Sequence, residues 1–485
     1  MASLRKEAIK GMSWTAIDRF GTKVIRIIIA MVIARILVPE DYGIIGMLAI
    51  FMALSQVVLD SGFGNALIQK KDRTNTDYCT AFYFNVVVGL VLYGILFVSA
   101  PLIARFYNTP LLTPVTRVYS LTLLIDSLNI VQTAKMRIEL KFNVLSTISL
   151  TTQLVTGVVG IYLAYNGWGV WALVYQALFS CLFRCALLWW RAHWWPSLVF
   201  SWDSFRHLFN FGSKLLLSGT IHTIYTNLYT LTIGKVYSPY EVGIYNQANH
   251  FAMIPSGLAS STIVTVNYPI LSRLQDDNAK LLVAYRKMLV SPLFLLYPLL
   301  MGVAALGEPL VQSLIGDQWL PIVPYMRVLC LAAMVSPLTT INLNLLYVKG
   351  RTDLVLKLDL IKKPIGIAVI FATMWFGLMP MVIGKAVFEC IALAFNCYYT
   401  HKVLNYGLMK QLREILPTAF RSLVMGIVCY GAALLVDGDL PKLLVGTLMG
   451  IITYALLAYV MKDPTLAELL PLIKKRLTRK NSVES

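Results

Sequence analysis

The chain alternates between long apolar stretches and short polar segments. Each apolar stretch has about 20 residues or more, enough for an α-helix rising 1.5 Å per residue to cross the hydrocarbon core of a bilayer. The stretches lie at about 12–37, 41–63, 78–100, 114–134, 142–165, 169–190, 209–236, 241–266, 287–307, 322–347, 358–377, 381–401, 416–436 and 441–461. This pattern predicts an all-α polytopic membrane protein with about fourteen transmembrane helices. An outer-membrane barrel would instead show strands of about ten residues with alternating polarity.

The composition excludes a soluble protein of this length. Of the 485 residues, 58% are hydrophobic and only 14% are charged, whereas a soluble chain carries about 25% charged residues. The formal net charge of +18 is large enough to raise the question of an acidic partner such as nucleic acid.

The distribution of basic residues answers that question. With the N-terminus in the cytoplasm, 29 of the 42 lysines and arginines fall in cytoplasmic segments, and the opposite side receives only Arg105 and Lys442. This asymmetry follows the positive-inside rule and requires all the stretches to alternate in direction. We therefore expect both termini in the cytoplasm. The basic charge faces anionic lipids, and no nucleic-acid partner is expected.

The sequence repeats itself at an offset of 200 residues. Residues 33–44 (IARILVPEDYGI) match residues 233–244 (IGKVYSPYEVGI), and a second match near an offset of 209 pairs residues 101–118 with 309–328. We expect an N-lobe of six helices over 1–200 and a C-lobe of six over 201–402. After these lobes we expect two further helices over 403–465 and a basic cytoplasmic tail over 466–485. Because six is even, the copies are parallel repeats, which is typical of transporters whose two bundles rock about a central site. Duplication for stability alone is the alternative.

Short motifs in a fixed order add a resemblance to known proteins. They are Lys10-Gly11 with Trp14, the run Ala34–Gly43, Asp60-x-Gly62 with Ile68-Gln69, the stretch Tyr245–Ala248, and the run 268–275. Over essentially the whole chain, the sequence resembles bacterial polysaccharide exporters of the teichuronic acid, colanic acid and lipopolysaccharide O-unit type. These belong to the multidrug/oligosaccharidyl-lipid/polysaccharide superfamily.

This resemblance implies a fold and a function. The implied fold has two six-helix lobes around a central cavity. The implied activity is flipping of undecaprenyl-pyrophosphate-linked oligosaccharides, the repeat units of a polysaccharide, across the bacterial inner membrane. Expected partners are the lipid-linked oligosaccharide, membrane lipids and the polysaccharide assembly machinery, with a monomer as the working unit. The families share no substrate motif, so the sugars are not identified.

The first apolar stretch contains a stripe of basic residues. Arg19, Lys23 and Arg26 are spaced i, i+4, i+7 and so lie on one face of a helix. A central Lys or Arg costs about 2.5–3.5 kcal/mol on insertion, so this helix cannot face lipid on all sides. Facing a wet cavity, the stripe suits a pyrophosphate. The alternative is snorkelling to the interface, with Asp18 paired to a neighbouring base.

Later stretches supply further candidate site residues. Lys214 and Arg184 join the predicted substrate-binding set, although snorkelling would explain Arg184 equally well. With the offset of 200, His222 falls at the depth of Lys23. A histidine changes charge near neutral pH, so His222 and His250, with Asp18 and Asp60, are candidates for coupling to H⁺ or Na⁺. A structural, hydrogen-bonded histidine is the alternative in each case. No cofactor or metal is expected.

Absent motifs narrow the function. The sequence has no G-x-x-x-x-G-K-[ST], no His-Glu-x-x-His and no Gly-x-Ser-x-Gly, so nucleotide, zinc and serine-nucleophile chemistry are not indicated. We therefore predict a secondary transporter and not an enzyme. One alternative is a drug or toxin antiporter of the same superfamily, whose cavity would be acidic. The other is a glycan polymerase or ligase, but the longest outward loops, about 101–113 and 308–321, are short and contain no His.

The predicted topology can be tested by cysteine labelling. On a cysteine-free background, an impermeant thiol reagent added to spheroplasts should modify an Asp317→Cys variant and leave a Lys71→Cys variant unmodified. The charge asymmetry places the first position outside and the second inside. Labelling of the Lys71→Cys variant in intact spheroplasts would contradict the fourteen-helix topology.

Overall fold

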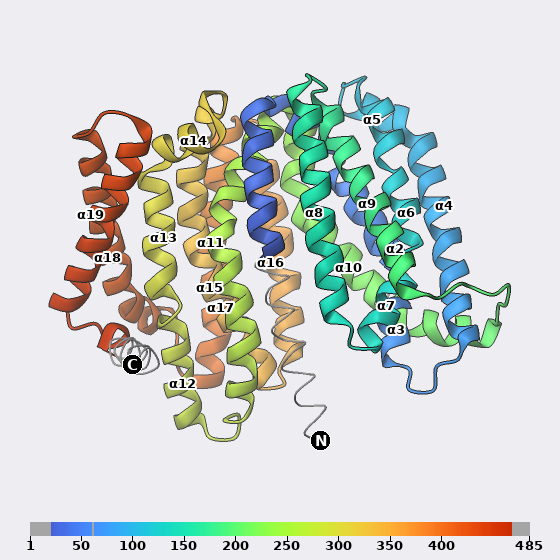
Figure 1. The fold of residues 1–485 in the computed structure, drawn as a ribbon. Coiled ribbons are helices and arrows are strands. Elements are labelled where there is room, and N and C mark those ends of the chain that lie inside the picture. Colours follow the sequence, from blue (N-terminus) through green and yellow to red (C-terminus); the bar gives the residue numbers. More distant parts are fainter. Residues whose placement is uncertain (1–20, 61–62, 468–485) are drawn as a thin grey trace, which may run out of the picture. The chain divides into compact units, whose positions relative to one another are not determined.

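The computed structural model describes residues 21–60 and 63–467, and every regular element in these residues is a helix (Figure 1). Nine helices of the described part are long and apolar enough to cross a membrane. The prediction of an all-α membrane fold is therefore confirmed. The count of fourteen spans remains a prediction.

The chain divides into two compact units, Met1–Gly243 and Ile244–Ser485. Unit 1 holds a helix over 21–36 and α2 (Pro39–Asp60), α3 (Phe63–Gln69), α4 (Asn75–Phe106), α5 (Leu112–Tyr119), α6 (Leu121–Ser127), α7 (Ile130–Ile138), α8 (Phe142–Tyr165), α9 (Val170–Ala192) and α10 (Trp202–Val236). Helix α11 (Pro239–Ser272) begins in unit 1 and continues into unit 2.

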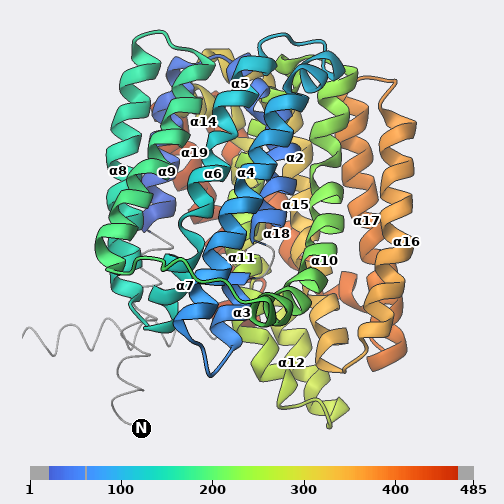
Figure 2. The same cartoon turned by 90° about the vertical axis from the view of Figure 1, so that its right-hand side faces the viewer.

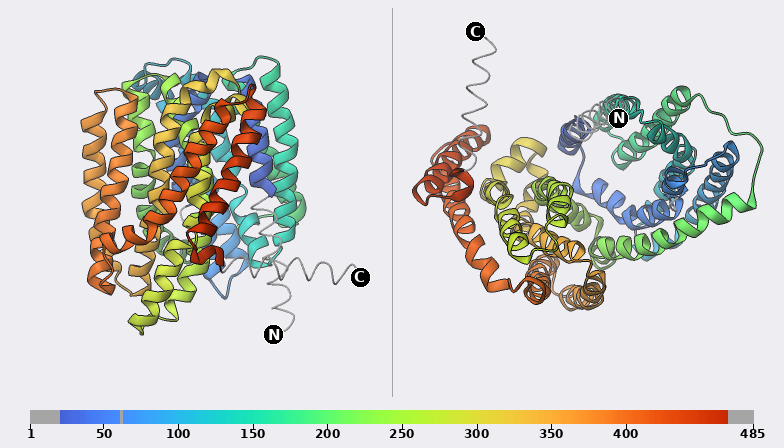
Figure 3. Two further views of the ribbon diagram at one scale, coloured as in Figure 1. Left: turned by 90° about the vertical axis from the view of Figure 1, so that its left-hand side faces the viewer. Right: turned by 90° about the horizontal axis from the view of Figure 1, so that it is seen from below.

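Unit 2 contains the remaining helices. They are α12 (Asn278–Val290), α13 (Leu293–Ala305), α14 (Gly307–Ile315), the 3₁₀ helix η1 (Asp317–Ile322), α15 (Val323–Val348), α16 (Thr352–Thr373), α17 (Leu378–Leu404), α18 (Leu408–Leu434) and α19 (Asp439–Val460). Helices α18 and α19 form a hairpin (Figure 3). Its core contains Met425, Cys429 and Tyr454.

Two predicted stretches differ from the structure: 114–134, and 287–307, which is divided between α12 and α13. Helix α8 covers the residues predicted for it, Phe142–Tyr165, but the stretch 114–134 is not one helix. It is divided among α5, α6 and α7. Hydroxyls near the breaks bond to backbone carbonyls: Thr122 donates to Tyr119 at 2.7 Å and Ser127 donates to Leu124 at 2.6 Å. Such bonds compete with the helical ladder, an effect that apolar periodicity does not reveal.

The repeated sequence motif has a local structural explanation. Helices α2 and α11 both begin at proline, whose fixed φ suits a first helical position. In α2 the Asp41 carboxylate accepts the backbone N–H of Val38 at 3.4 Å. In α11 the Glu241 carboxylate accepts that of Ser238 at 3.1 Å. The Pro-x-acid sequence therefore begins both helices in the same way.

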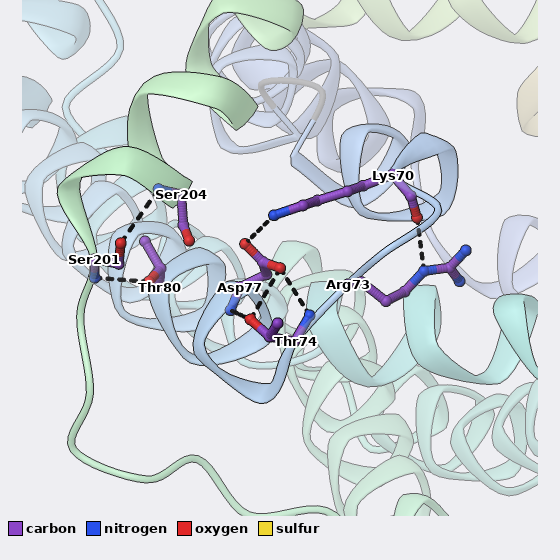
Figure 4. A network of polar contacts seen from close by, with 7 residues as sticks. All are labelled: Lys70, Arg73, Thr74, Asp77, Thr80, Ser201 and Ser204. Carbon is purple, nitrogen blue, oxygen red and sulfur yellow. Dashed lines mark hydrogen bonds and ion pairs between the residues drawn. The ribbon is translucent and has the colours of Figure 1, made fainter.

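A polar network fixes the segment between α9 and α10, which runs past the ends of the unit 1 helices (Figure 2). Asp77 is fully buried, pairs with Lys70 at 2.7 Å, and forms a reciprocal cap with Thr74 at the start of α4 (Figure 4). The backbone N–H of Ser201 bonds to the Thr80 hydroxyl at 3.1 Å, and the Ser201 side chain caps α10. These bonds hold the start of α10 against α4.

The starts of α2 and α11 approach each other so closely that each contact requires glycine. A Cβ on Gly43 would lie 1.7 Å from the carbonyl oxygen of Pro239, and a Cβ on Gly243 would lie 2.0 Å from that of Pro39. Backbone atoms occupy both positions, so no side-chain rotation can relieve the overlap. The two helices would have to move apart.

This contact predicts a strong effect for the smallest substitution. Gly43→Ala and Gly243→Ala should each lower the free energy of unfolding by about 1–3 kcal/mol, the usual cost of overpacking, or prevent folding. Gly94→Ala in α4 is the control, because its Cβ would meet no atom within 4 Å and alanine is the better helix former. Thermal unfolding in detergent measures the difference. Equal stability of Gly43→Ala and Gly94→Ala would contradict the contact.

Candidate functional site

Unit 1 encloses a cavity of about 880 Å³. Its wall is built from the end of α2, the helices α3, α6 and α7, the first two turns of α8, and α9. On the predicted topology these parts all lie toward the cytoplasmic side. A second space of about 290 Å³ shares Gln56 and Asp126 with it.

Many of the lining side chains are polar. They are Gln56, Asp60, Asn65, Asp126, Asn129, Thr133, Arg137, Ser146, Ser149 and Arg184. An ion pair joins Asp126 on α6 to Arg184 on α9. The Asp126 side chain is mostly buried and the Arg184 side chain is partly exposed, so the pair lies at the border between protein and cavity.

The predicted residues Arg184 and Asp60 therefore lie in the wall of one cavity. Asp60 is the last residue of α2. Asp126, Arg137 and Arg184 are close enough to influence its carboxylate electrostatically. Two carboxylates and two guanidinium groups thus share the space, and their formal charges cancel.

Asn129, Thr133 and Arg137 also line the cavity, although no sequence motif indicates a site at these positions. Counted from Asp126, their spacing of three, four and four residues would place them on one face of a continuous helix, but Asp126 lies on α6 whereas Thr133 and Arg137 lie on α7. Asn129 is 5% exposed, and both polar atoms of its amide lack a hydrogen-bond partner among the described residues. The charge distribution alone makes Arg137 one of the 29 basic residues expected in cytoplasmic segments.

The basic stripe is only partly within the described residues. Arg19 and Asp18 lie outside them, whereas Lys23 and Arg26 are exposed on the helix 21–36. Ile33, two turns after Arg26, therefore lies on the same side of the helix, and it is buried against Ala164 and Ala172. Arg26 therefore lies on the side of the helix 21–36 that, two turns later, packs against other helices of unit 1.

The remaining predicted residues do not gather into one site. The side chain of Lys214 lies outside the described part of α10. His222 is exposed on α10, and its backbone carbonyl accepts a bond from the Thr226 hydroxyl at 3.0 Å. His250 is exposed on α11, in unit 2. No group of His, Cys, Asp and Glu in the described residues could hold a metal ion.

Unit 2 contains a buried polar network that the sequence did not indicate. The amides of Asn342 on α15 and Gln411 on α18 bond to each other in both directions at 3.0 Å. The Thr400 hydroxyl on α17 donates to Asn342 at 2.6 Å. Lys362 on α16 donates to Asn396 at 3.0 Å. These partners are far apart in sequence, so no periodicity connects them.

Comparison with known proteins adds a family. The family model described as "Polysaccharide biosynthesis protein" matches residues 32–324, more than half of the chain. The teichuronic acid biosynthesis protein TuaB of Bacillus subtilis (strain 168) is 25% identical over 440 residues, which cover 90% of each chain. The lipopolysaccharide biosynthesis protein WzxC of Escherichia coli (strain K12) is 25% identical over 432 residues, covering 88% of this chain and 85% of that protein.

Solved structures show the same fold. The lipid II flippase MurJ in an inward closed conformation aligns with a TM-score of 0.75 at 14% identity, over 92% of this chain and 98% of that one. An inward-facing multidrug resistance MATE family transporter of the MOP superfamily aligns with a TM-score of 0.58 at 13% identity, over 81% of this chain and 99% of that one. At these identities the likeness concerns the fold alone.

Proposed function

The chain belongs to the family of polysaccharide biosynthesis proteins, and from this premise we propose that it flips a lipid-linked oligosaccharide across the bacterial inner membrane. The relatives named for teichuronic acid and lipopolysaccharide biosynthesis match along most of the length of the chain, and the fold resembles that of a lipid II flippase. The substrate we propose is a polysaccharide repeat unit on undecaprenyl pyrophosphate. The lipid anchor requires a membrane-embedded path, which a bundle of spanning helices supplies.

The arrangement we propose has fourteen spans and two parallel six-helix repeats. Five predicted stretches add to the nine long apolar helices: the helix over 21–36, the series α5–α7, and the helices α10, α11 and α16. The matching starts of α2 and α11 support the repeat. Alternating access of the two lobes, with both termini in the cytoplasm, would carry the substrate outward.

One observation supports the site for the pyrophosphate. Arg26 is exposed on the side of the helix 21–36 that packs against unit 1 two turns later. We propose that Lys23 and Arg26, together with Arg19 and Lys214, bind the pyrophosphate, with Arg184 nearby in the cavity of unit 1. Guanidinium and ammonium groups form strong charge-assisted bonds to phosphate oxygens.

The pyrophosphate site predicts loss of export without loss of the protein. Lys23→Gln and Arg26→Gln should each reduce substrate affinity by about 10- to 150-fold, the value of one charge-assisted bond. Insertion should not suffer, because each change removes a charge from a spanning helix. The measurement is accumulation of unflipped lipid-linked glycan in cells with matched expression. Arg35→Gln is the control. Arg35 comes nine residues after Arg26, and at 3.6 residues per turn this separation places it on the opposite side of the helix.

Normal export by a variant carrying both Lys23→Gln and Arg26→Gln would remove the basis for this pyrophosphate site. The control also separates local charge from overall charge. If Arg35→Gln reduces export as much as Arg26→Gln, the effect comes from the overall charge of the helix and its orientation in the membrane, and not from a binding site on one face.

The alternative functions fit less well. A carrier of organic cations would need an excess of acidic side chains where its substrate binds. The cavity of unit 1 instead balances two acids with two bases, and the first helix exposes Lys23 and Arg26. The flippase therefore remains the function that the described residues support best.

Transport without a nucleotide-binding motif requires another source of energy. We propose coupling to H⁺ or Na⁺, with His222, His250, Asp18 and Asp60 as the candidate groups. In proteoliposomes, flipping should be several-fold faster with an imposed ion gradient than without one. His222→Gln or His250→Gln should remove that acceleration. Equal rates with and without gradients would show an equilibrating flippase driven by removal of its product.

A further inference from the structure

Unit 2 contains a groove that has no part in the proposed pyrophosphate site. It has a volume of about 560 Å³ and is lined by residues of α13, α15 and α18 and by Met461, which follows α19. Every lining residue except Arg413 is apolar. A volume of this size lies within the range of small-molecule sites. The lining suits a ligand that is hydrocarbon apart from one charged group.

The groove has the depth of one leaflet of the bilayer. Arg413 precedes the apolar stretch 416–436, at the end of α18 that the predicted topology places in the cytoplasm. Leu423, the lining residue farthest along α18, comes ten residues later, which is about 15 Å along a helix. The hydrocarbon core is about 30 Å thick. The groove therefore extends from the cytoplasmic interface to about the middle of the membrane.

The charge of Arg413 is available to a ligand. The residue is exposed and forms no ion pair among the described residues, and the neighbouring acid, Glu414, pairs with Arg286 on α12. An arginine at the cytoplasmic interface attracts anionic headgroups. Its planar guanidinium can also bond to two oxygens of one phosphate.

The apolar side chains of the groove provide a second, independent observation. Met301 on α13, Met334 on α15 and Met461 all line it. Methionine is unbranched and adapts its shape to irregular apolar partners. None of the described residues that line the groove is β-branched, and β-branched side chains are the stiff ones. Such a surface can follow a flexible hydrocarbon chain.

We propose that this groove binds one anionic phospholipid of the cytoplasmic leaflet, with an acyl chain along the helices and the phosphate against Arg413. An acyl chain occupies one leaflet, which is the depth of the groove, whereas an undecaprenyl chain is much longer. The bound lipid is therefore a resident of the membrane and not the transported substrate. It contacts α13, α15 and α18 together and supports their packing.

The test compares two phospholipids with identical acyl chains. The full-length protein, freed of native lipid in detergent, is titrated with dioleoylphosphatidylglycerol, which is anionic, and with dioleoylphosphatidylcholine, which has no net charge. Native mass spectrometry gives the affinity of the first bound lipid. The wild type should prefer phosphatidylglycerol about five-fold, the usual effect of one arginine near an anionic lipid. Arg413→Gln should remove this preference. Ala419→Leu, which adds bulk within the groove, should weaken binding of both lipids.

Two positions in unit 2 provide matched controls. Arg273 is exposed just after α11 and does not line the groove, so Arg273→Gln should keep the five-fold preference. Gly431 lies on α18 outside the groove, and a Cβ there would meet no atom within 4 Å. Gly431→Leu adds bulk to the same helix and should bind both lipids as the wild type does. Thermal unfolding verifies that all the variants fold.

Several results would overturn the assignment. An unchanged preference in Arg413→Gln, or an equal loss in Arg273→Gln, would show that the headgroup does not bind at Arg413. Unchanged affinities in Ala419→Leu would show that the acyl chain lies elsewhere. If undecaprenyl phosphate displaces the first phosphatidylglycerol from the wild type, the groove belongs to the path of the transported lipid.

Discussion

The hydrocarbon core of a membrane offers no hydrogen-bond partners, and this constraint determines how the chain treats every polar group. Backbone N–H and C=O groups must bond within the protein, and helices satisfy them segment by segment. The described residues accordingly form helices with short connections. A polar side chain within such a bundle then has three physical solutions: a partner in the protein, a path to the interface, or an internal space that admits water or a ligand.

Both units contain buried polar side chains that are paired within the protein. In unit 2 the amides of Asn342 and Gln411 satisfy each other, and Arg421 on α18 pairs with Asp463 after α19 while both side chains are almost completely buried. Such buried networks fix the packing of helices. In unit 1 the buried Asp77 is likewise paired, with Lys70 and Thr74, whereas other polar residues line a cavity.

The sequence predicted the helices well because length and hydropathy are local properties. It failed at 114–134, which is divided among α5, α6 and α7 and where Ser and Thr hydroxyls bond to backbone carbonyls near the breaks. For the cavity of unit 1, Arg184 and Asp60 were recognised because a charge within an apolar stretch is conspicuous. The partner of Arg184, Asp126, lies 58 residues away, and no periodicity connects two positions on different helices. Uncharged Asn129 and Thr133 differ too little from the ordinary polar residues of a helix to indicate a site.

The contact between the starts of α2 and α11 has a consequence for how such a chain can evolve. Each glycine faces the proline carbonyl of the other helix, so neither position can acquire a side chain while the opposite backbone stays in place. After a duplication, most matching positions in two copies can diverge separately. These two cannot, because a change in either copy is opposed by the other. The Pro-to-Gly spacing should therefore persist in both halves of related chains long after the surrounding residues have lost their similarity.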